Sequence, residues 1–313
     1  MKRLTLWIGL AVVALAGCDR IGSDATVPTV AILNLLSHPI LDESVAGIRE
    51  GLAEAGFDGD AIRIIESNAN GEMDRIRPLV QELLAVQPDV FIPVSTPVSQ
   101  AAFAIAPSTQ QVVFSTVTNP DDIGFSEQPQ NWTGVSDAVN YEANIDLIFT
   151  LVPEARRIGM VFNPSEANSQ YGVEAVRRIG AERGFELVTA PVQGSGEVRD
   201  AAASLASQVD ALYVGSDNTV VAAIASLLSA AEDARVPVVS SDAGSVSEGV
   251  PIAVSVDYRA LGREVGRIVA ELLASGGAAG EIPMVQFLGD QVVTNPSGAA
   301  RLNMTLPDSL VHR

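Results

Sequence analysis

Residues 90–119 read VFIPVSTPVSQAAFAIAPSTQQVVFSTVTN, and residues 211–246 repeat the same pattern as ALYVGSDNTVVAAIASLLSAAEDARVPVVSSDAGSV. Each stretch holds a short apolar run, a cluster of small polar residues, an alanine-rich helical segment, a second apolar run and a second polar cluster. In a parallel α/β sheet such clusters fall at the carboxyl ends of strands, where these sheets bind ligands. Two such units far apart in one chain indicate two facing lobes with a ligand between them.

Apolar strand patterns alternate with helical patterns along most of the remaining chain. Residues 29–35 and 61–66 predict the first two strands, and an amphipathic helix is expected after each. The alternation restarts after residue 153, with further strands expected over residues 157–162 and 185–190. This order predicts two Rossmann-like lobes, each built on a doubly wound parallel sheet with right-handed crossovers.

The helix and strand expected over residues 259–288 predict how the lobes are joined. A helix–strand pair that follows two complete lobes can return to the first lobe and complete its sheet. The chain then crosses between the lobes three times, near residues 137–140, 256–258 and 288–292, and three adjacent crossings form a hinge. We expect a first lobe of residues 29–138 and 257–288, and a second lobe of residues 139–256 and 289–313.

The composition favours a hydrophobic core of aliphatic residues and argues against a nucleic-acid partner. Of the 313 residues, 47% are hydrophobic and only 5% are aromatic, and the formal net charge is −19. A length of this size fits one large domain or two ordinary ones. The negative charge argues against nucleic acid, because binding phosphates requires a basic face.

The first 18 residues predict a signal peptide with a lipid attachment site. Residues 1–18 combine a basic start with an apolar segment too short to span a bilayer permanently, and the segment ends in Leu-Ala-Gly-Cys. That ending resembles the bacterial lipobox, in which the cysteine, here Cys18, becomes the lipidated first residue. The alternative is a plain secretory signal with an incidental cysteine. Asp19 resembles the signal for retention at the inner membrane, and residues 19–28 are expected to form a tether.

Short motifs along the chain resemble the substrate-binding lipoproteins of ABC transporters, a family that includes tryptophan- and tyrosine-binding members. The motifs occur in the family's order between residue 29 and about residue 273. They are LSHPILD (36–42), STP (95–97), FSTVTNP (114–120), TGVSD (133–137), NPSEANS (163–169), SDNT (216–219), SDAGSV (241–246) and DYRALG (257–262).

The resemblance implies the type I periplasmic binding protein fold, a clamshell that closes on a small molecule. It further implies a monomer that needs no cofactor and delivers its ligand to an ABC permease in the membrane, to which the lipid on Cys18 anchors the chain. Family membership suggests an amino acid, possibly aromatic, as the ligand.

An amino acid presents a carboxylate and an ammonium group, and each must be paired when it is buried. Helix N-termini and hydroxyl groups suit the carboxylate, and acidic residues suit the ammonium group. We expect Asp217 or Asp242 to accept the ammonium group, although either side chain can instead cap a helix. The full set of predicted ligand-binding residues is Ser37, Ser95, Thr96, Ser115, Thr118, Asn168, Ser169, Asp217, Asn218 and Asp242.

Three further groups of residues have alternative roles. His38 follows a predicted strand and is either a ligand contact or a rim residue. Glu166 is expected to face solvent or to pair with the ammonium group. The four tyrosines at positions 141, 171, 213 and 258 are more typical of packing than of ligand stacking.

Signatures of enzymes and metal sites are missing from the sequence. It contains no Gly-x-Ser-x-Gly elbow, no Walker loop and no Gly-x-Gly-x-x-Gly after the first strand. His38 and His312 are the only histidines and Cys18 is the only cysteine, so no His/Cys metal shell is expected. We therefore expect a binding protein, with a sensory binding protein and an enzyme on the same fold as the alternative classes.

Within the class of binding proteins, the chemical alternative to an amino acid is a sugar. Sugar sites usually carry stacking aromatic rings, and Trp132 is the only tryptophan after the signal segment. The ammonium hypothesis predicts that replacing both Asp217 and Asp242 with alanine abolishes amino-acid binding and leaves the fold intact.

Overall fold

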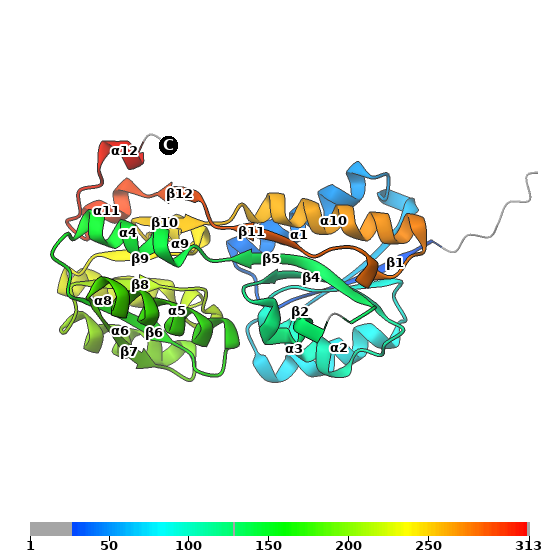
Figure 1. Cartoon of the computed structure of the whole chain (residues 1–313), viewed down its shortest axis with the longest axis horizontal. Coiled ribbons are helices and arrows are strands. Elements are labelled where there is room, and N and C mark those ends of the chain that lie inside the picture. Colours follow the sequence, from blue (N-terminus) through cyan, green and yellow to red (C-terminus); the bar gives the residue numbers. More distant parts are fainter. Residues whose placement is uncertain (1–26, 128, 312–313) are drawn as a thin grey trace, which may run out of the picture.

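The computed structural model describes residues 27–127 and 129–311. The chain forms two lobes that lie next to each other, and each lobe is built around one six-stranded sheet (Figure 1). The predicted signal peptide, Cys18 and Asp19 lie outside the described residues. Within the described part of the chain, no helix is long and apolar enough to cross a membrane.

The first lobe has an all-parallel sheet with the strand order β11-β5-β4-β3-β1-β2. Its strands are β1 (Thr29–Asn34), β2 (Arg63–Asn68), β3 (Val90–Pro93), β4 (Gln111–Val117), β5 (Trp132–Ala138) and β11 (Val285–Leu288). Its helices are α1 (Pro39–Glu54), α2 (Met73–Ala85), α3 (Thr96–Ile105) and α10 (Tyr258–Ser275). The central strand β3 is apolar throughout because helices cover both faces of the sheet.

The second lobe has the strand order β12-β10-β9-β8-β6-β7. Its strands are β6 (Arg157–Phe162), β7 (Glu186–Pro191), β8 (Ala211–Val214), β9 (Val238–Ser240), β10 (Ile252–Ser255) and β12 (Gln291–Thr294). Its helices are α4 (Tyr141–Leu151), α5 (Ala167–Arg183), α6 (Val198–Ala206), α7 (Asn218–Val221), α8 (Ile224–Ala234), α9 (Ala243–Ser247), α11 (Pro296–Arg301) and α12 (Asp308–Val311). Only β12 runs antiparallel to its neighbour among these strands. The two predicted doubly wound sheets are thus confirmed.

Three connections join the lobes, and they lie side by side along one edge of the molecule (Figure 1). They run from β5 to α4, from β10 to α10 and from β11 to β12. Gly289, in the third connection, donates its backbone N–H to the carbonyl of Ala138 at 3.0 Å. A Cβ added to Gly289 would lie 3.4 Å from Ser255 and 3.6 Å from Asn140, which belong to the other two connections. The predicted three-crossing hinge is therefore present.

Helices α1 and α10 pack so closely that only glycine fits between them. Gly47 and Gly51 on α1 face Gly262 and Gly266 on α10. A Cβ at any of these four positions would lie within van der Waals overlap of a backbone oxygen of the other helix. Small residues spaced four apart on both helices therefore let the two backbones meet. This contact fixes α10, and with it Tyr258 at the start of α10, against the first lobe.

We predict that Gly47→Ala lowers the free energy of unfolding by about 2 kcal/mol or more, because an added methyl group forces the helices apart. Urea denaturation followed by circular dichroism measures the change. Gly196→Ala is the matched control, because a Cβ at Gly196 meets no atom within 4 Å. Equal stability of the two variants would contradict the close packing.

Candidate ligand-binding site

A cavity lies between the two lobes, at the carboxyl ends of strands in both sheets. Seven of the ten predicted ligand-binding residues line it, namely Ser95, Thr96, Thr118, Asn168, Asp217, Asn218 and Asp242. The structure thus brings together residues from both stretches that first indicated two lobes. The remaining walls come from α1, the ends of β4 and β5, and the start of α10.

The other three predicted residues do not border this cavity. Ser37 is exposed on the surface, where Asn68 donates a hydrogen bond to its hydroxyl. Ser115 is fully buried, and its hydroxyl lies 3.0 Å from that of Ser44. Ser169 is buried behind the cavity and donates its hydroxyl to Asp217. Each is close to the cleft along the chain, but its side chain is directed elsewhere.

Asp217 caps α7, and partners from its own lobe occupy both of its carboxylate oxygens. Oδ1 accepts from the backbone N–H of Val220 at 2.8 Å, and Oδ2 accepts from the backbone N–H of Asn163 at 2.6 Å. Burial, together with the nearby charge of Glu166, raises the pKa of Asp217 to about 7. The capping alternative that the sequence left open for Asp217 is therefore present.

Asp242 caps α9 in the same way. Its Oδ1 accepts from Gly244 N at 2.9 Å, and its Oδ2 accepts from Ser245 N at 2.9 Å and from the Ser245 hydroxyl. Replacing a saturated buried cap leaves backbone donors without partners and costs stability. The expectation that the double alanine change at Asp217 and Asp242 leaves the fold intact is inconsistent with this bonding.

Glu166 does not face solvent, because only 2% of its surface is exposed. Its carboxylate accepts hydrogen bonds from the backbone and side chain of both Asn218 and Thr219. It also accepts from Asn168 Nδ2 at 3.3 Å. Glu166 thus ties the start of α7 to the start of α5 and shapes the second-lobe wall of the cavity.

Asp137, at the end of β5, is the site residue that the sequence did not reveal. It lines the cavity and only 3% of it is exposed. The hydroxyl of Tyr258 donates to Oδ2 at 3.0 Å, whereas Oδ1 has no hydrogen-bond partner among the described residues. Burial raises the pKa of Asp137 to about 7, although the Tyr258 hydrogen bond opposes this shift. Unlike Asp217 and Asp242, Asp137 retains an oxygen that can accept a bond from a ligand.

Asn168 and Ser95 carry further polar atoms without partners in the described chain. Asn168 donates its Nδ2 to Ser216 O at 2.6 Å and leaves Oδ1 free to accept. Ser95 precedes the ten-residue helix α3, and its buried hydroxyl has no partner either. Its φ of 91° is strained for a residue with a Cβ, and strain of this kind gathers at binding sites.

Within residues 27–127 and 129–311, the cavity lining contains carboxylates and neutral polar groups but no arginine or lysine. A negatively charged group on a ligand would therefore depend on hydroxyl groups and on the N-terminus of α3 for its hydrogen bonds. A positively charged group would meet Asp137. Apolar side chains of Ile40, Leu41 and Val221 cover other parts of the wall.

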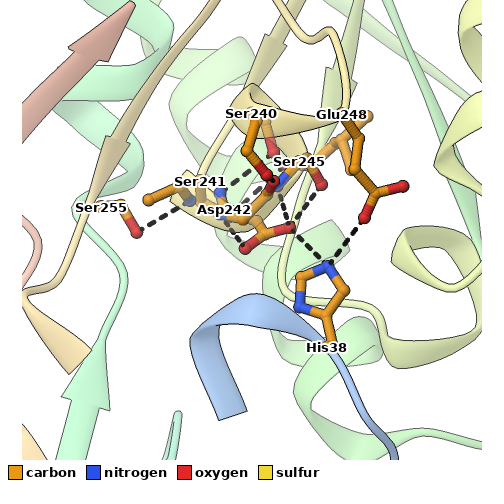
Figure 2. Close-up of polar contacts among 11 residues, drawn as sticks. His38, Ser240, Ser241, Asp242, Ser245, Glu248 and Ser255 are labelled. Carbon is orange, nitrogen blue, oxygen red and sulfur yellow. Dashed lines mark hydrogen bonds and ion pairs between the residues drawn. The ribbon is translucent and has the colours of Figure 1, made fainter. Parts of the chain in front are cut away.

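Thr118 and His38 of the first lobe make direct contacts across the cleft near this cavity. The hydroxyl of Thr118 in the first lobe donates to that of Ser216 in the second lobe at 3.4 Å. His38, which the sequence placed at a strand end, does not line the cavity but reaches across to Asp242 and Glu248 (Figure 2). The cleft is therefore narrow enough for side chains of the two lobes to touch.

The two lobes, the three-crossing hinge and the cavity between the sheets define a type I periplasmic binding protein. The model of the family described as ABC transporter substrate binding protein matches residues 29–313, and the chain belongs to this family. A curated relative, the tyrosine-binding protein of Clostridioides difficile, is 30% identical over 280 residues, which are 88% of this chain and 81% of the relative.

Two solved structures show which state of the lobes the chain resembles. The ABC domain from Streptococcus pneumoniae in complex with L-Trp is 27% identical, covers 91% of this chain and 97% of its own, and has a TM-score of 0.85. The ligand-free, open structure of a substrate-binding protein with adhesive properties from Clostridium difficile is 28% identical. It covers 90% of this chain and 97% of its own, but its TM-score is 0.68. At nearly equal identity, the lobes are therefore arranged more as in the ligand-bound structure, and we describe this arrangement as closed.

The raised pKa of Asp137 predicts how its contribution to stability changes with pH. Below about pH 4 the carboxyl group is protonated in both the folded and the unfolded chain. As the pH rises toward 7, the unfolded chain ionises while buried Asp137 stays protonated, so folding is progressively disfavoured. We predict that the stability of the wild type relative to Asp137→Asn falls across this range and is constant at higher pH. Urea denaturation at several pH values measures it, with exposed Asp58→Asn as the control, and a difference that does not vary with pH would contradict the assignment.

Proposed function

We propose that the chain is the lipid-anchored, extracytoplasmic binding component of an ABC importer and that its ligand is a free amino acid. The observation that carries the ligand class is the set of unpaired polar atoms around the cavity. Asp137 Oδ1 and Asn168 Oδ1 are acceptors, and the Ser95 hydroxyl is a donor at a helix N-terminus. An α-amino group suits the first two, and an α-carboxylate suits the third.

The proposed ammonium partner is Asp137 rather than Asp217 or Asp242. Burying an ammonium group requires an acceptor that is not already used, and the two capping aspartates have their oxygens bound within the second lobe. When the amino group binds, its positive charge favours the ionised form of Asp137 and lowers the pKa that burial has raised. Tyr258 holds the carboxylate in place through Oδ2.

The side chain of the ligand is proposed to be aromatic. The family relatives named for tyrosine binding or solved with L-Trp support this choice, as do the apolar walls formed by Ile40, Leu41 and Val221. A sugar is the weaker candidate, because Tyr258 is the only aromatic residue among the described residues that line the cavity, and its hydroxyl is held by Asp137. A sensory role would use the same cavity and differ only in the membrane partner.

A thermal-shift screen over amino acids and sugars tests the ligand class first. A ligand at a hundredfold excess over its dissociation constant stabilises the protein by roughly 2.7 kcal/mol. Calorimetric titration with L-tryptophan and L-tyrosine then tests the ammonium site. We predict that Asp137→Asn weakens binding by roughly 30-fold, because a charge-assisted hydrogen bond in a buried site is lost.

Matched compounds and a matched variant sharpen that titration. Tryptamine lacks the carboxylate and indole-3-propionate lacks the amino group, so both should bind more weakly than L-tryptophan to the wild type. Asp58→Asn, at an exposed position, should bind as the wild type does. Equal affinity of the wild type and Asp137→Asn for the amino acid would refute the assignment, and a shift with sugars alone would refute the ligand class.

The lipid anchor, which lies outside the described residues, is tested separately. We predict that Cys18→Ser moves the protein from the membrane fraction to the soluble fraction and abolishes labelling by a radioactive fatty acid, because no other cysteine is present. Ser23→Ala in the tether is the control and should remain at the membrane. A wild type that is itself soluble and takes up no fatty-acid label would favour the alternative of a plain secretory signal.

A further inference from the structure

His38 of the first lobe lies between two carboxylates of the second lobe. It directly precedes α1, and its imidazole is 4% exposed. Nε2 lies 3.4 Å from Asp242 Oδ2 and 3.9 Å from Glu248 Oε1, at opposite ends of α9 (Figure 2). His38 and α9 are far apart in the sequence, so their contact exists only because the two lobes meet at this place.

Gly244 lets the imidazole approach α9 this closely. A Cβ at Gly244 would lie 2.6 Å from His38 Cε1 and 3.1 Å from Pro39 Cβ, both in the other lobe, and 3.1 Å from Asp242 Oδ1 in its own lobe. The backbone of Gly244 is not among the glycines with positive φ, so its own conformation admits an alanine. The closest neighbour of a side chain at this position is thus the imidazole of the opposite lobe, which reaches it when the cleft is closed.

The second-lobe side of this contact, Asp242, is held in place by hydrogen bonds within the second lobe itself. Asp242 is held by hydrogen bonds from Gly244 and Ser245, and its own N–H donates to Ser240 Oγ at 3.0 Å. Asp242 also lines the ligand cavity. One residue therefore belongs both to the wall around the ligand and to the surface that His38 meets, so closure over a ligand and formation of this contact occur together.

We propose that His38 is a latch between the lobes: its contact with Asp242 and Glu248, and its packing on Gly244, hold the closed form over a bound ligand. The proposal rests on the proposed function, because a latch acts only in a protein that closes on its ligand. In the open form the imidazole and α9 separate, and neither needs the other to fold. The latch slows ligand release and leaves ligand entry unchanged.

Stopped-flow kinetics with L-tryptophan as the probe separate a latch from a general structural role. We expect His38→Gln and Gly244→Ala to raise the dissociation rate constant roughly tenfold, because the first removes a buried contact with a carboxylate and the second places a methyl group against the imidazole. The association rate constant and the melting temperature of the ligand-free protein should stay as in the wild type. Gly196→Ala, a glycine of the same lobe with no neighbour at its Cβ, is the matched control and should release ligand at the wild-type rate.

One additional measurement addresses the mechanism. Spin labels on Glu82→Cys in α2 and Asp200→Cys in α6, placed in a Cys18→Ser background, report the separation of the lobes. With L-tryptophan the wild type should show one short distance, and Gly244→Ala should retain a population at longer distance.

The outcomes distinguish failure of the latch from failure of the proposed function. Unchanged dissociation rates in both variants, with normal binding by the wild type, would overturn the latch alone. A lower melting temperature of both ligand-free variants would also overturn it, since the contact would then serve folding. A wild type that binds no amino acid would overturn the proposed function on which the latch rests.

Discussion

Burying a carboxyl group in a protein costs free energy unless other groups pair with it, and the cavity of this chain is organised by that constraint. Three acids line it, and two of them are satisfied within the second lobe by the helices that they cap. The third, Asp137, has one oxygen held by Tyr258 and the other free. The unsatisfied charge is therefore concentrated at one point, beside the hinge, where a positively charged group can bind.

This arrangement gives the two walls of the cleft different tasks. The acids of the second lobe are paired within it: Glu166, Asp217 and Asp242 fix the starts of α5, α7 and α9 and hold the wall rigid. The first lobe supplies unpaired groups, including the strained Ser95 ahead of α3, and the second lobe adds Asn168 Oδ1. A ligand that satisfies both walls gains more free energy in the closed form than in the open form, which is the condition for closure to depend on ligand.

Much of the fold was predictable because it depends on local patterns. Runs such as residues 90–93 and 111–117 are apolar and short, so they indicate buried strands whatever their partners are. The small polar clusters after them mark strand ends, and most of the predicted site residues accordingly line the cavity. The glycines at positions 47, 51, 262 and 266 also carried a readable signal, since their spacing of four is typical of closely packed helices.

The bonding inside the site was not predictable in the same way. Whether the carboxylate oxygens of an aspartate already have hydrogen-bond partners depends on the donors that surround it. One donor to Asp217 is the backbone N–H of Asn163, which is far away in the sequence. In the sequence Asp137 is simply the end of a predicted strand. Its role was not visible there because its partner Tyr258 lies 121 residues further along the chain. Ser115 lies on a predicted strand end, yet its hydroxyl meets Ser44 behind the cavity. These outcomes follow from tertiary contacts that residue types alone do not encode.

The ionisation of Asp137 is the quantity on which this account depends most directly. Nuclear magnetic resonance of the 13C-labelled side-chain carboxyl group can follow it in the ligand-free protein and in the protein saturated with L-tryptophan. The account predicts titration of Asp137 at about pH 7 without ligand and a clearly lower midpoint with ligand, because a bound ammonium group stabilises the carboxylate. A midpoint that the bound amino acid leaves unchanged would contradict it.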